Sequence, residues 1–352
     1  MTKLTTGIKQ YWFLIGLLIV MGLAWVYPEI GRKGGWIRSE ITINYITVSL
    51  IFFISGLDLK TSTLLDALLY WRLILTVQSI SFILLPVLTL GICKLLGLVG
   101  YNSNLIDGIL ISIICPTTVS SNVVMTQASH GNTAASLVNS VVGNSIGIII
   151  SPSLIILFFN LQAGNTKPID FISVIVNLTL TILVPLVIGQ LVRYWVPNVV
   201  NWISRVNLSN VNSVLLLLLI YTIFCESFYH HHFKGISVIS FLILMIITIV
   251  QFGGFVVICW GIARQIGFDC RDVVAIVFSG ASKSIVTGLP ILYATFGSSD
   301  NVGLLAVPMI VYQALQLVMG AVLVNIFRDW VDGEIQRLNL DSNVHLEMTP
   351  LN

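Results

Sequence analysis

Charged residues are scarce in this chain. Only 9% of its 352 residues are Asp, Glu, Lys or Arg, whereas about 25% are charged in a typical soluble protein. Hydrophobic residues make up 56% of the sequence, and the mean hydropathy is +0.97. This composition excludes a soluble globular domain and predicts an all-α polytopic membrane protein. The formal charge of +2 comes without a large basic patch, so we expect no nucleic-acid partner.

The patterns of a metal site, a disulfide framework and an intramembrane enzyme are also missing. The five cysteines are Cys93, Cys115, Cys225, Cys259 and Cys270, and they are scattered in or beside hydrophobic segments. Their spacing matches neither a metal site nor a disulfide framework. We therefore expect all five cysteines to be small apolar residues of the core. The sequence has no HExxH motif, no Ser/His pair at membrane depth and no paired intramembrane aspartates. We therefore expect a protein that is not an enzyme.

Long apolar runs fill most of the chain. About 20 apolar residues cross a bilayer core as a helix, and this rule predicts ten transmembrane helices. Their approximate ranges are 10–28, 41–57, 71–97, 105–130, 132–161, 171–192, 213–229, 236–263, 272–297 and 301–327. We expect a membrane domain over residues 10–327, with residues 1–9 and the polar tail 328–352 outside the bilayer. More Lys and Arg residues lie in loops on the amino-terminal side, so both termini are expected to be cytoplasmic.

Two of these spans, the fourth and the ninth, are interrupted by polar residues. The fourth contains CPTTVSSN at 115–122, and the ninth contains SGASKS at 279–284. Backbone groups freed by such breaks persist at membrane depth only when they are buried in protein or line a cavity. Paired breaks in corresponding positions of two halves indicate the binding site of a secondary transporter.

The placement of the breaks predicts an inverted repeat of five plus five helices. The first half covers 10–161 and the second covers 171–327, and an odd number of spans forces the halves into opposite orientations. Asp107 precedes the first break much as Asp272 precedes the second. This match in spacing supports the repeat.

The first break combines a helix breaker with oxygen ligands. Pro116 removes a backbone donor and opens the helix. The hydroxyl and amide groups that we expect to bind an alkali cation or a polar solute group are those of Thr117, Thr118, Ser121, Asn122, Ser136 and Ser140. Ser136 and Ser140 are four residues apart and share one helix face. The alternative is that these groups only join neighbouring helices, but their concentration beside a break favours binding.

Lys283 is the sharpest single signal in the second break. It lies between the apolar runs 273–278 and 285–292, where a lysine costs about 2.5–3.5 kcal/mol on insertion scales. We expect carbonyl groups of the break, with Ser282 and Ser284, to surround its ammonium group. The alternative is that the span is displaced and that Lys283 lies at the membrane interface.

Two other polar features carry weaker predictions. Glu226 ends the seventh span, so an interfacial carboxylate is expected there. The run of three histidines at 230–232 has no carboxylate or cysteine to complete a metal site, which favours a solvated loop.

Three stretches of this sequence resemble the bile acid:sodium symporter superfamily. They are IFFISGLDLK at 51–60, CPTTVSSNVVMT at 115–126 and KSIVTGLP at 283–290. The set is similar to the sodium/bile acid cotransporter 7 branch, which includes fungal regulators of calcium uptake, and the resemblance extends to about residue 327. It implies a core domain of helices 3–5 and 8–10, in which the broken helices 4 and 9 cross, and a panel domain of helices 1, 2, 6 and 7.

The resemblance also implies where sodium would bind. In sodium-coupled members the first break and the next helix hold one ion, and the matching residues here are Ser121, Asn122, Ser136 and Ser140. A second ion uses a glutamate whose position is Ala281 here, and a third-helix glutamine whose position is Ser81. We hypothesise that the ammonium group of Lys283 replaces this second ion, because like charges about 4 Å apart repel by ~4 kcal/mol even at an effective dielectric of about 20. No other cofactor is expected.

Two functions remain open. The first is a negative regulator of cytosolic calcium or calcium influx that retains a transport site for a small anionic solute. The alternative is a sodium- or proton-coupled organic solute carrier with no direct role in calcium. We expect the plasma membrane, with the Golgi or another endomembrane as the alternative. The expected partners are membrane lipid, a solute or ion, and a calcium channel or another membrane protein.

Overall fold

The computed structural model describes residues 15–16, 18–39, 42–58, 70–163, 176, 179–196, 208–230, 237–296 and 301–347. Every regular element within these ranges is a helix. The predictions for residues 1–9, for His231 and His232, and for the last residues of the tail, 348–352, concern positions outside the described ranges.

Helices of membrane-spanning length dominate the described part of the chain. Six are long and apolar enough to cross a bilayer: Trp71–Leu98, Thr133–Phe159, Val211–Tyr229, Val238–Ile266, Cys270–Phe296 and Val302–Arg337. Three shorter apolar helices cover Val48–Leu57, Ser103–Ile114 and Thr179–Trp195. The prediction of an all-α, multi-pass membrane protein is therefore confirmed, while the count of ten spans stays a prediction.

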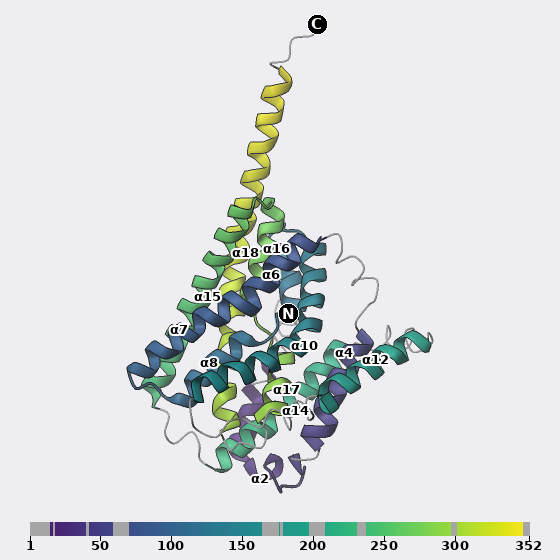
Figure 1. Ribbon diagram of the computed structural model, residues 1–352, viewed down its shortest axis with the longest axis vertical. Coiled ribbons are helices and arrows are strands. Elements are labelled where there is room, and N and C mark those ends of the chain that lie inside the picture. The colour runs from purple at the N-terminus through teal and green to yellow at the C-terminus, as the bar shows by residue number, and fades with distance from the viewer. Residues whose placement is uncertain are drawn as a thin grey trace, which may run out of the picture.

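One group of helices packs together in the lower part of Figure 1. Its members are α2 (Pro28–Gly31), α4 (Val48–Asp58) after the π-helix η1 (Thr42–Thr47), α12 (Val184–Trp195) after the π-helix η4 (Thr179–Leu183), and α14 (Leu208–Tyr229). Helix α4 packs along α12, and α14 packs against α2 and α4. The close approach of α4 to α12 depends on Gly56 and Gly189, where an added Cβ atom would collide with backbone oxygens of the facing helix.

A second group contains both broken spans. Its members are α6 (Trp71–Ser79), the π-helix η3 (Ile80–Leu84), α7 (Leu85–Leu98), α8 (Ser103–Ile114), α9 (Ser120–Ala128), α10 (Thr133–Ala163), α15 (Val238–Ile266), α16 (Cys270–Ala281), α17 (Ile285–Phe296) and α18 (Val302–Glu347). Figure 1 shows the long α18, in yellow-green to yellow, running through this group and out of it.

Both predicted breaks are present, and they meet. Helix α8 ends at Ile114 and α9 begins at Ser120, while α16 ends at Ala281 and α17 begins at Ile285. The backbone N–H of Ser284 in the second break donates to the carbonyl oxygen of Pro116 in the first at 2.8 Å. The two interruptions therefore lie side by side within one helix bundle.

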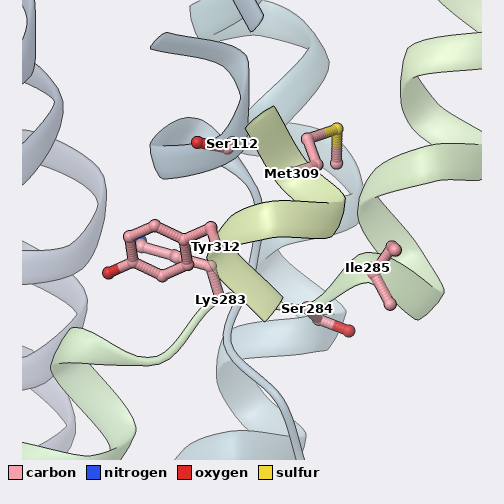
Figure 2. A pocket seen from close by; sticks show the side chains of 6 residues that line it. All are labelled: Ser112, Lys283, Ser284, Ile285, Met309 and Tyr312. Atoms are coloured by element: carbon pink, nitrogen blue, oxygen red, sulfur yellow. The ribbon is translucent and has the colours of Figure 1, made fainter. Parts of the chain in front are cut away.

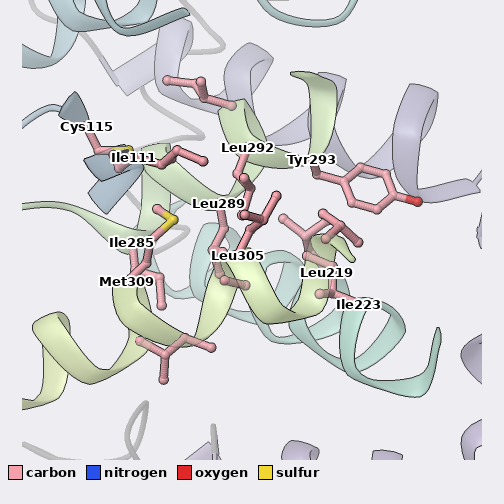
Figure 3. Packing of buried hydrophobic residues seen from close by; sticks show 14 of the residues in the cluster. Ile111, Cys115, Leu219, Ile223, Ile285, Leu289, Leu292, Tyr293, Leu305 and Met309 are labelled. Carbon is pink, nitrogen blue, oxygen red and sulfur yellow. Dashed lines mark hydrogen bonds between the residues drawn. The ribbon is translucent and has the colours of Figure 1, made fainter. Parts of the chain in front are cut away.

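Apolar side chains surround the point where the breaks meet. Figure 3 shows Ile111 of α8 and Leu289 of α17 packed with Leu305 of α18 and with Leu219 and Ile223 of α14. Helix α14 thereby joins the first group of helices to the second. A second cluster of buried apolar residues is built mainly by α15 and α16.

The polar tail begins as a continuation of α18. This helix passes the predicted end of the last span at residue 327 and runs to Glu347. The part of α18 just after residue 327 packs against the rest of the protein. Val331 is fully buried, and Asp332 accepts a hydrogen bond from His130 at 2.8 Å. Glu334 lies 4.0 Å from Arg264. These contacts explain why the helix does not stop where the apolar pattern stops.

The close contact between α4 and α12 leads to a stability prediction. We expect Gly56→Ala to lower the free energy of unfolding by about 1–3 kcal/mol, because the new methyl group would press on the rigid carbonyl of Leu186. The midpoint of thermal unfolding in detergent measures this. Gly254→Ala is the matched control, since no atom lies within 4 Å of its added Cβ atom. Equal effects of the two substitutions would contradict the prediction.

Candidate functional site

The side chain of Lys283 is buried inside the protein. Only 3% of the residue is exposed. Its Nζ donates to the hydroxyl of Ser81 at 2.6 Å and to the carbonyl oxygen of Ser81 at 3.0 Å, and it lies 5.8 Å from the centre of the Phe82 ring. Lys283 is thus enclosed by protein, while its depth in the membrane stays a prediction. The expected surroundings are corrected, because Ser81 of another span binds the ammonium group in place of carbonyls of its own break.

Local helix geometry explains why the Ser81 carbonyl is available. Ser81 lies in the π-helix η3, where the N–H of Leu85 donates to the carbonyl of Ile80, five residues back. In this register the donor to Ser81 would be residue 86, which is Pro86 and has no N–H. The carbonyl can therefore point its lone pairs at a group outside the helix.

The backbone of the second break is hydrogen-bonded by glutamines of α18. The amide oxygen of Gln316 accepts from the N–H of Lys283 at 2.8 Å, and its Nε2 donates to the Lys283 carbonyl at 2.7 Å. The same Nε2 donates to Gln313 at 2.9 Å. One side chain thus satisfies both backbone groups of Lys283, which would otherwise be orphaned in the membrane.

The neighbouring residues of the second break are held in a similar way. The Tyr312 hydroxyl donates to the carbonyl of Ala281 at 2.7 Å. The N–H of Ser284 donates to the carbonyl oxygen of Pro116, and the Ser284 hydroxyl accepts a long 3.5 Å hydrogen bond from the N–H of Thr287. Ser282 and Ser284 are both buried. They flank Lys283 along the chain, and Ser81 provides the hydrogen bonds to its ammonium group.

The space around Lys283 is closed in this structure. Figure 2 shows its lining, which comes from α8, the second break, α17 and α18. The lining residues are Ser112, Lys283, Ser284, Ile285, Met309 and Tyr312, and no part of the space is wide enough for a water molecule. A solute can therefore reach Lys283 only after the helices move apart.

The first break forms a compact network of neutral oxygens and one amide. Asn122 is fully buried, and its Nδ2 donates to the Thr117 hydroxyl and the Thr118 carbonyl, both at 2.6 Å. Its Oδ1 accepts from the Thr118 hydroxyl at 2.8 Å. Ser121 donates to the Thr118 hydroxyl at 2.6 Å, and Ser140 of α10 lies 3.4 Å from Asn122 Nδ2.

Ser136 takes a different place from its predicted neighbours. Its hydroxyl accepts from Thr126 at 3.2 Å and lies 3.4 Å from the hydroxyl of Ser279 on α16. It is one turn away from Ser140 on the same helix, so it links α10 to the other broken span. The structure thus brings Thr117, Thr118, Ser121, Asn122 and Ser140 into one network, with Ser136 beside it.

The oxygen atoms of this network are of the kind that bind an alkali cation. Sodium prefers hard oxygen ligands, and the hydroxyl groups with the amide of Asn122 supply them. In the hydrogen-bonded arrangement the Asn122 amide turns Nδ2 toward Ser140, so holding a cation would require the amide to present its oxygen there. No group of three or more His, Cys, Asp or Glu residues suited to a metal ion occurs in the described part of the chain.

Each break is supported by an amide from the helix that follows it. Asn144 of α10 donates to the carbonyl of Thr117 in the first break at 2.7 Å. Gln316 of α18 supports the second break in the same way, through the carbonyl and N–H of Lys283. Gln313 and Gln316 are absent from the residues predicted for the site. Two glutamines three residues apart in an apolar span are the signal that could have revealed them.

Glu226 lies away from the breaks, at the end of α14. It is 4% exposed, and it accepts from the backbone N–H of Lys33 at 2.7 Å. His230 lies 3.5 Å away. The carboxylate therefore joins α14 to the turn after α2.

Two broken helices that meet at a buried ammonium group and buried oxygen ligands are features of a multi-pass membrane transporter. The chain belongs to the SBF-like CPA transporter family, whose model matches residues 11–329. It is 34% identical to sodium/bile acid cotransporter 7 of Xenopus tropicalis over 336 residues, which cover 95% of this chain and 96% of the relative. The mouse (Mus musculus) protein of that name is 34% identical over 332 residues, 94% of this chain and 96% of the relative.

A fungal relative also matches over nearly the whole chain. Solute carrier RCH1 of Candida albicans is 30% identical over 378 aligned residues, which cover 95% of this chain and 92% of the relative. These relatives confirm the predicted family, and they are named as transporters and carriers, not enzymes.

The glutamine support of the second break leads to a prediction for Gln316. We expect Gln316→Leu to lower the free energy of unfolding by about 2–6 kcal/mol, because it leaves a buried N–H and a buried C=O of Lys283 unpaired at roughly 1–3 kcal/mol each. Thermal unfolding in detergent measures the loss. Gln127→Leu on the exposed face of α9 is the control, and a Gln316 variant as stable as that control would refute the assigned role.

Proposed function

We propose that this protein is a secondary transporter of a small anionic solute, in which Lys283 acts as a built-in cation, and that its activity restrains calcium entry. The observation that carries the proposal is the buried ammonium group of Lys283, held by neutral Ser81 at the point where the two breaks meet.

The charge of the site favours an anion. Neither break contains an Asp or a Glu, and the groups hydrogen-bonded to Lys283 Nζ are neutral. Burial of an unpaired charge is costly, and buried charges in proteins are paired with an opposite charge. An anionic solute would supply that charge, and it would also find backbone N–H groups at the start of α9.

The packing of the helices supports an inverted repeat. Helix α8 packs against α7 and α18, and α16 packs against α15 and α10. Helix α9 packs against α10 and α18, and α17 packs against α18 and α10. Each half thus repeats the contacts of the other with the roles exchanged, as expected when a core domain of two inverted repeats rocks against a panel. The group of α2, α4, α12 and α14 would be that panel.

The calcium role rests on the resemblance to the branch that includes fungal regulators of calcium uptake. On this proposal the protein lies in the plasma membrane, with the Golgi or another endomembrane as the alternative, and both termini are cytoplasmic. A calcium channel or another membrane protein would then respond to its activity. Direct calcium transport fits poorly, because Ca²⁺ takes about 6–8 oxygen ligands that include carboxylates, and the breaks offer hydroxyl and amide groups beside a lysine.

A second function is favoured by the oxygen network of the first break. Ser121, Asn122 and Ser140 provide neutral ligands of the kind that a sodium ion uses. A sodium- or proton-coupled organic solute carrier with no direct role in calcium would also use this network.

The role of Lys283 is tested by its replacement. In sodium-free choline buffer we expect formate, acetate, sulfate or phosphate to raise the midpoint of thermal unfolding of the wild-type protein. Lys283→Ala should weaken that anion effect about tenfold or more, because a charge-assisted hydrogen bond is lost, and should make stability depend on sodium. Lys94→Ala, at an exposed lysine, is the control. A Lys283→Ala protein with unchanged anion binding and no new need for sodium contradicts the proposal.

The calcium role is tested in cells. Loss of the gene should raise the cytosolic calcium concentration reached after calcium is added to the medium. Expression of the wild-type protein should return that concentration to its normal level. We expect the Lys283→Ala and Asn122→Ala proteins to reach the membrane but to leave the calcium concentration raised. The Lys94→Ala protein should return it to its normal level. Restoration by the two site variants would mean regulation by contact, without transport.

A further inference from the structure

We propose that a cavity between the end of α7 and the start of α8 binds the ammonium group of an aminophospholipid through the carboxylate of Asp107. The ligand chemistry is a primary ammonium group, and the surroundings of the cavity favour a lipid as its source. None of the residues that line this cavity lines the space around Lys283. The inference therefore needs a membrane protein, but it does not depend on the proposed transport function.

The cavity is wide, in contrast to the closed space around Lys283. Its volume is about 470 Å³, and cavities that bind small ligands range over about 300–1,000 Å³. Leu90 and Gly97 of α7 line one side, and Ser103, Ile106 and Asp107 of α8 line the other. The cavity thus offers apolar walls, a hydroxyl group and a carboxylate.

The walls of the cavity are fixed without a ligand. The Cys93 thiol of α7 donates to the carbonyl oxygen of Ile106 in α8 at 3.6 Å. Asn102 caps the first turn of α8 with its side chain. The hydroxyl of Tyr101, in the turn between the two helices, donates to the carbonyl oxygen of Ser240 on α15 at 2.6 Å. A ligand would therefore meet a preformed site.

Asp107 is the group in this cavity that lacks a partner. It is half-buried, and within the described ranges no hydrogen bond or ion pair joins it to another residue. Asp272 precedes the second break much as Asp107 precedes the first, and its carboxylate accepts from Asn132 at 2.8 Å. Partial burial of an unpaired carboxylate is costly. A ligand with a positive group that donates hydrogen bonds would remove that cost at Asp107.

A second charge at the cavity limits the kind of cation. Lys94 also lines it and is exposed, and it forms no ion pair with Asp107. Its like charge would repel a simple cation, although solvent screens part of that repulsion. The head group of an aminophospholipid carries a phosphate as well as an ammonium group. Because the two charges balance, Lys94 does not exclude such a head group.

The position of the cavity favours a lipid over a free amine. The apolar helix Trp71–Leu98 has 28 residues. A helix of this length is ~42 Å long, whereas the hydrocarbon core of a bilayer is about 30 Å thick. The last turns of α7, which line the cavity, therefore reach the level of the head groups. Leu95 and Leu98 in these turns are 64% and 85% exposed, as expected for side chains that contact acyl chains.

Lipid binding to the full-length protein in detergent tests the role of the carboxylate. Native mass spectrometry measures the affinity for dioleoyl phosphatidylethanolamine and for dioleoyl phosphatidylcholine, whose ammonium group has no N–H. We expect wild-type protein to prefer phosphatidylethanolamine. Asp107→Asn should weaken that affinity about tenfold, as for loss of a charge-assisted hydrogen bond, and leave the affinity for phosphatidylcholine unchanged. Asp329→Asn, at an exposed carboxylate, is the control.

Three results of this experiment would overturn the inference. The first is equal affinity of the wild-type protein for the two lipids. The second is a wild-type affinity for phosphatidylethanolamine in Asp107→Asn, and the third is an equal loss of both lipids in that variant, which would indicate general loosening. Free ethanolamine is tested in parallel. If it raises the midpoint of thermal unfolding as much as phosphatidylethanolamine does, the lipid is overturned as the source of the ammonium group.

A second pair of variants tests the cavity while the carboxylate stays in place. No atom lies within 4 Å of a Cβ atom added at Gly97 or at Gly91 of α7, but Gly97 lines the cavity and Gly91 does not. We expect Gly97→Leu to fill the space and weaken binding of phosphatidylethanolamine about tenfold or more. Gly91→Leu should bind it as the wild-type protein does. Equal affinities of these two variants would place the lipid elsewhere and overturn the site.

Discussion

Hydrogen bonding of the interrupted backbone is the constraint on which this structure depends. A helix break within a membrane frees N–H and C=O groups that lipid cannot satisfy. The protein satisfies them with amides, Asn144 for Thr117 and Gln316 for Lys283, and with the bond from Ser284 to Pro116. Because each break is bonded to the helix after it or to the other break, the two interruptions are fixed together as one site.

The same arrangement sets the electrostatics of the site. The amine of Lys283 is surrounded by neutral acceptors and lies in a space too narrow for water. The neutral oxygens around Asn122 lie in the adjoining break. On the proposed function, Lys283 would bind an anion and the oxygen ligands of the first break would bind a cation in a neighbouring position. The closed space implies that helix motion controls access to both.

Much of this site could be predicted from the sequence, because polar residues stand out in apolar spans. The two breaks, the burial of Lys283 and the clustering of Asn122 with Thr117 are all of that kind, and the structure bears them out. The partner of Lys283 could not be predicted, because it depends on the π register of η3 and on which face α6 and α7 turn toward α16. The continuation of α18 past residue 327 was also hidden, since it depends on tertiary contacts such as that of Asp332 with His130.

An experimental structure in a lipid nanodisc, at a resolution that shows side chains, tests the central claim most directly. The account predicts that residues 115–119 and 282–284 are both non-helical within the hydrocarbon layer, with the Lys283 nitrogen on the oxygens of Ser81. A continuous helix through either segment, or a Lys283 amine in bulk solvent, would contradict it.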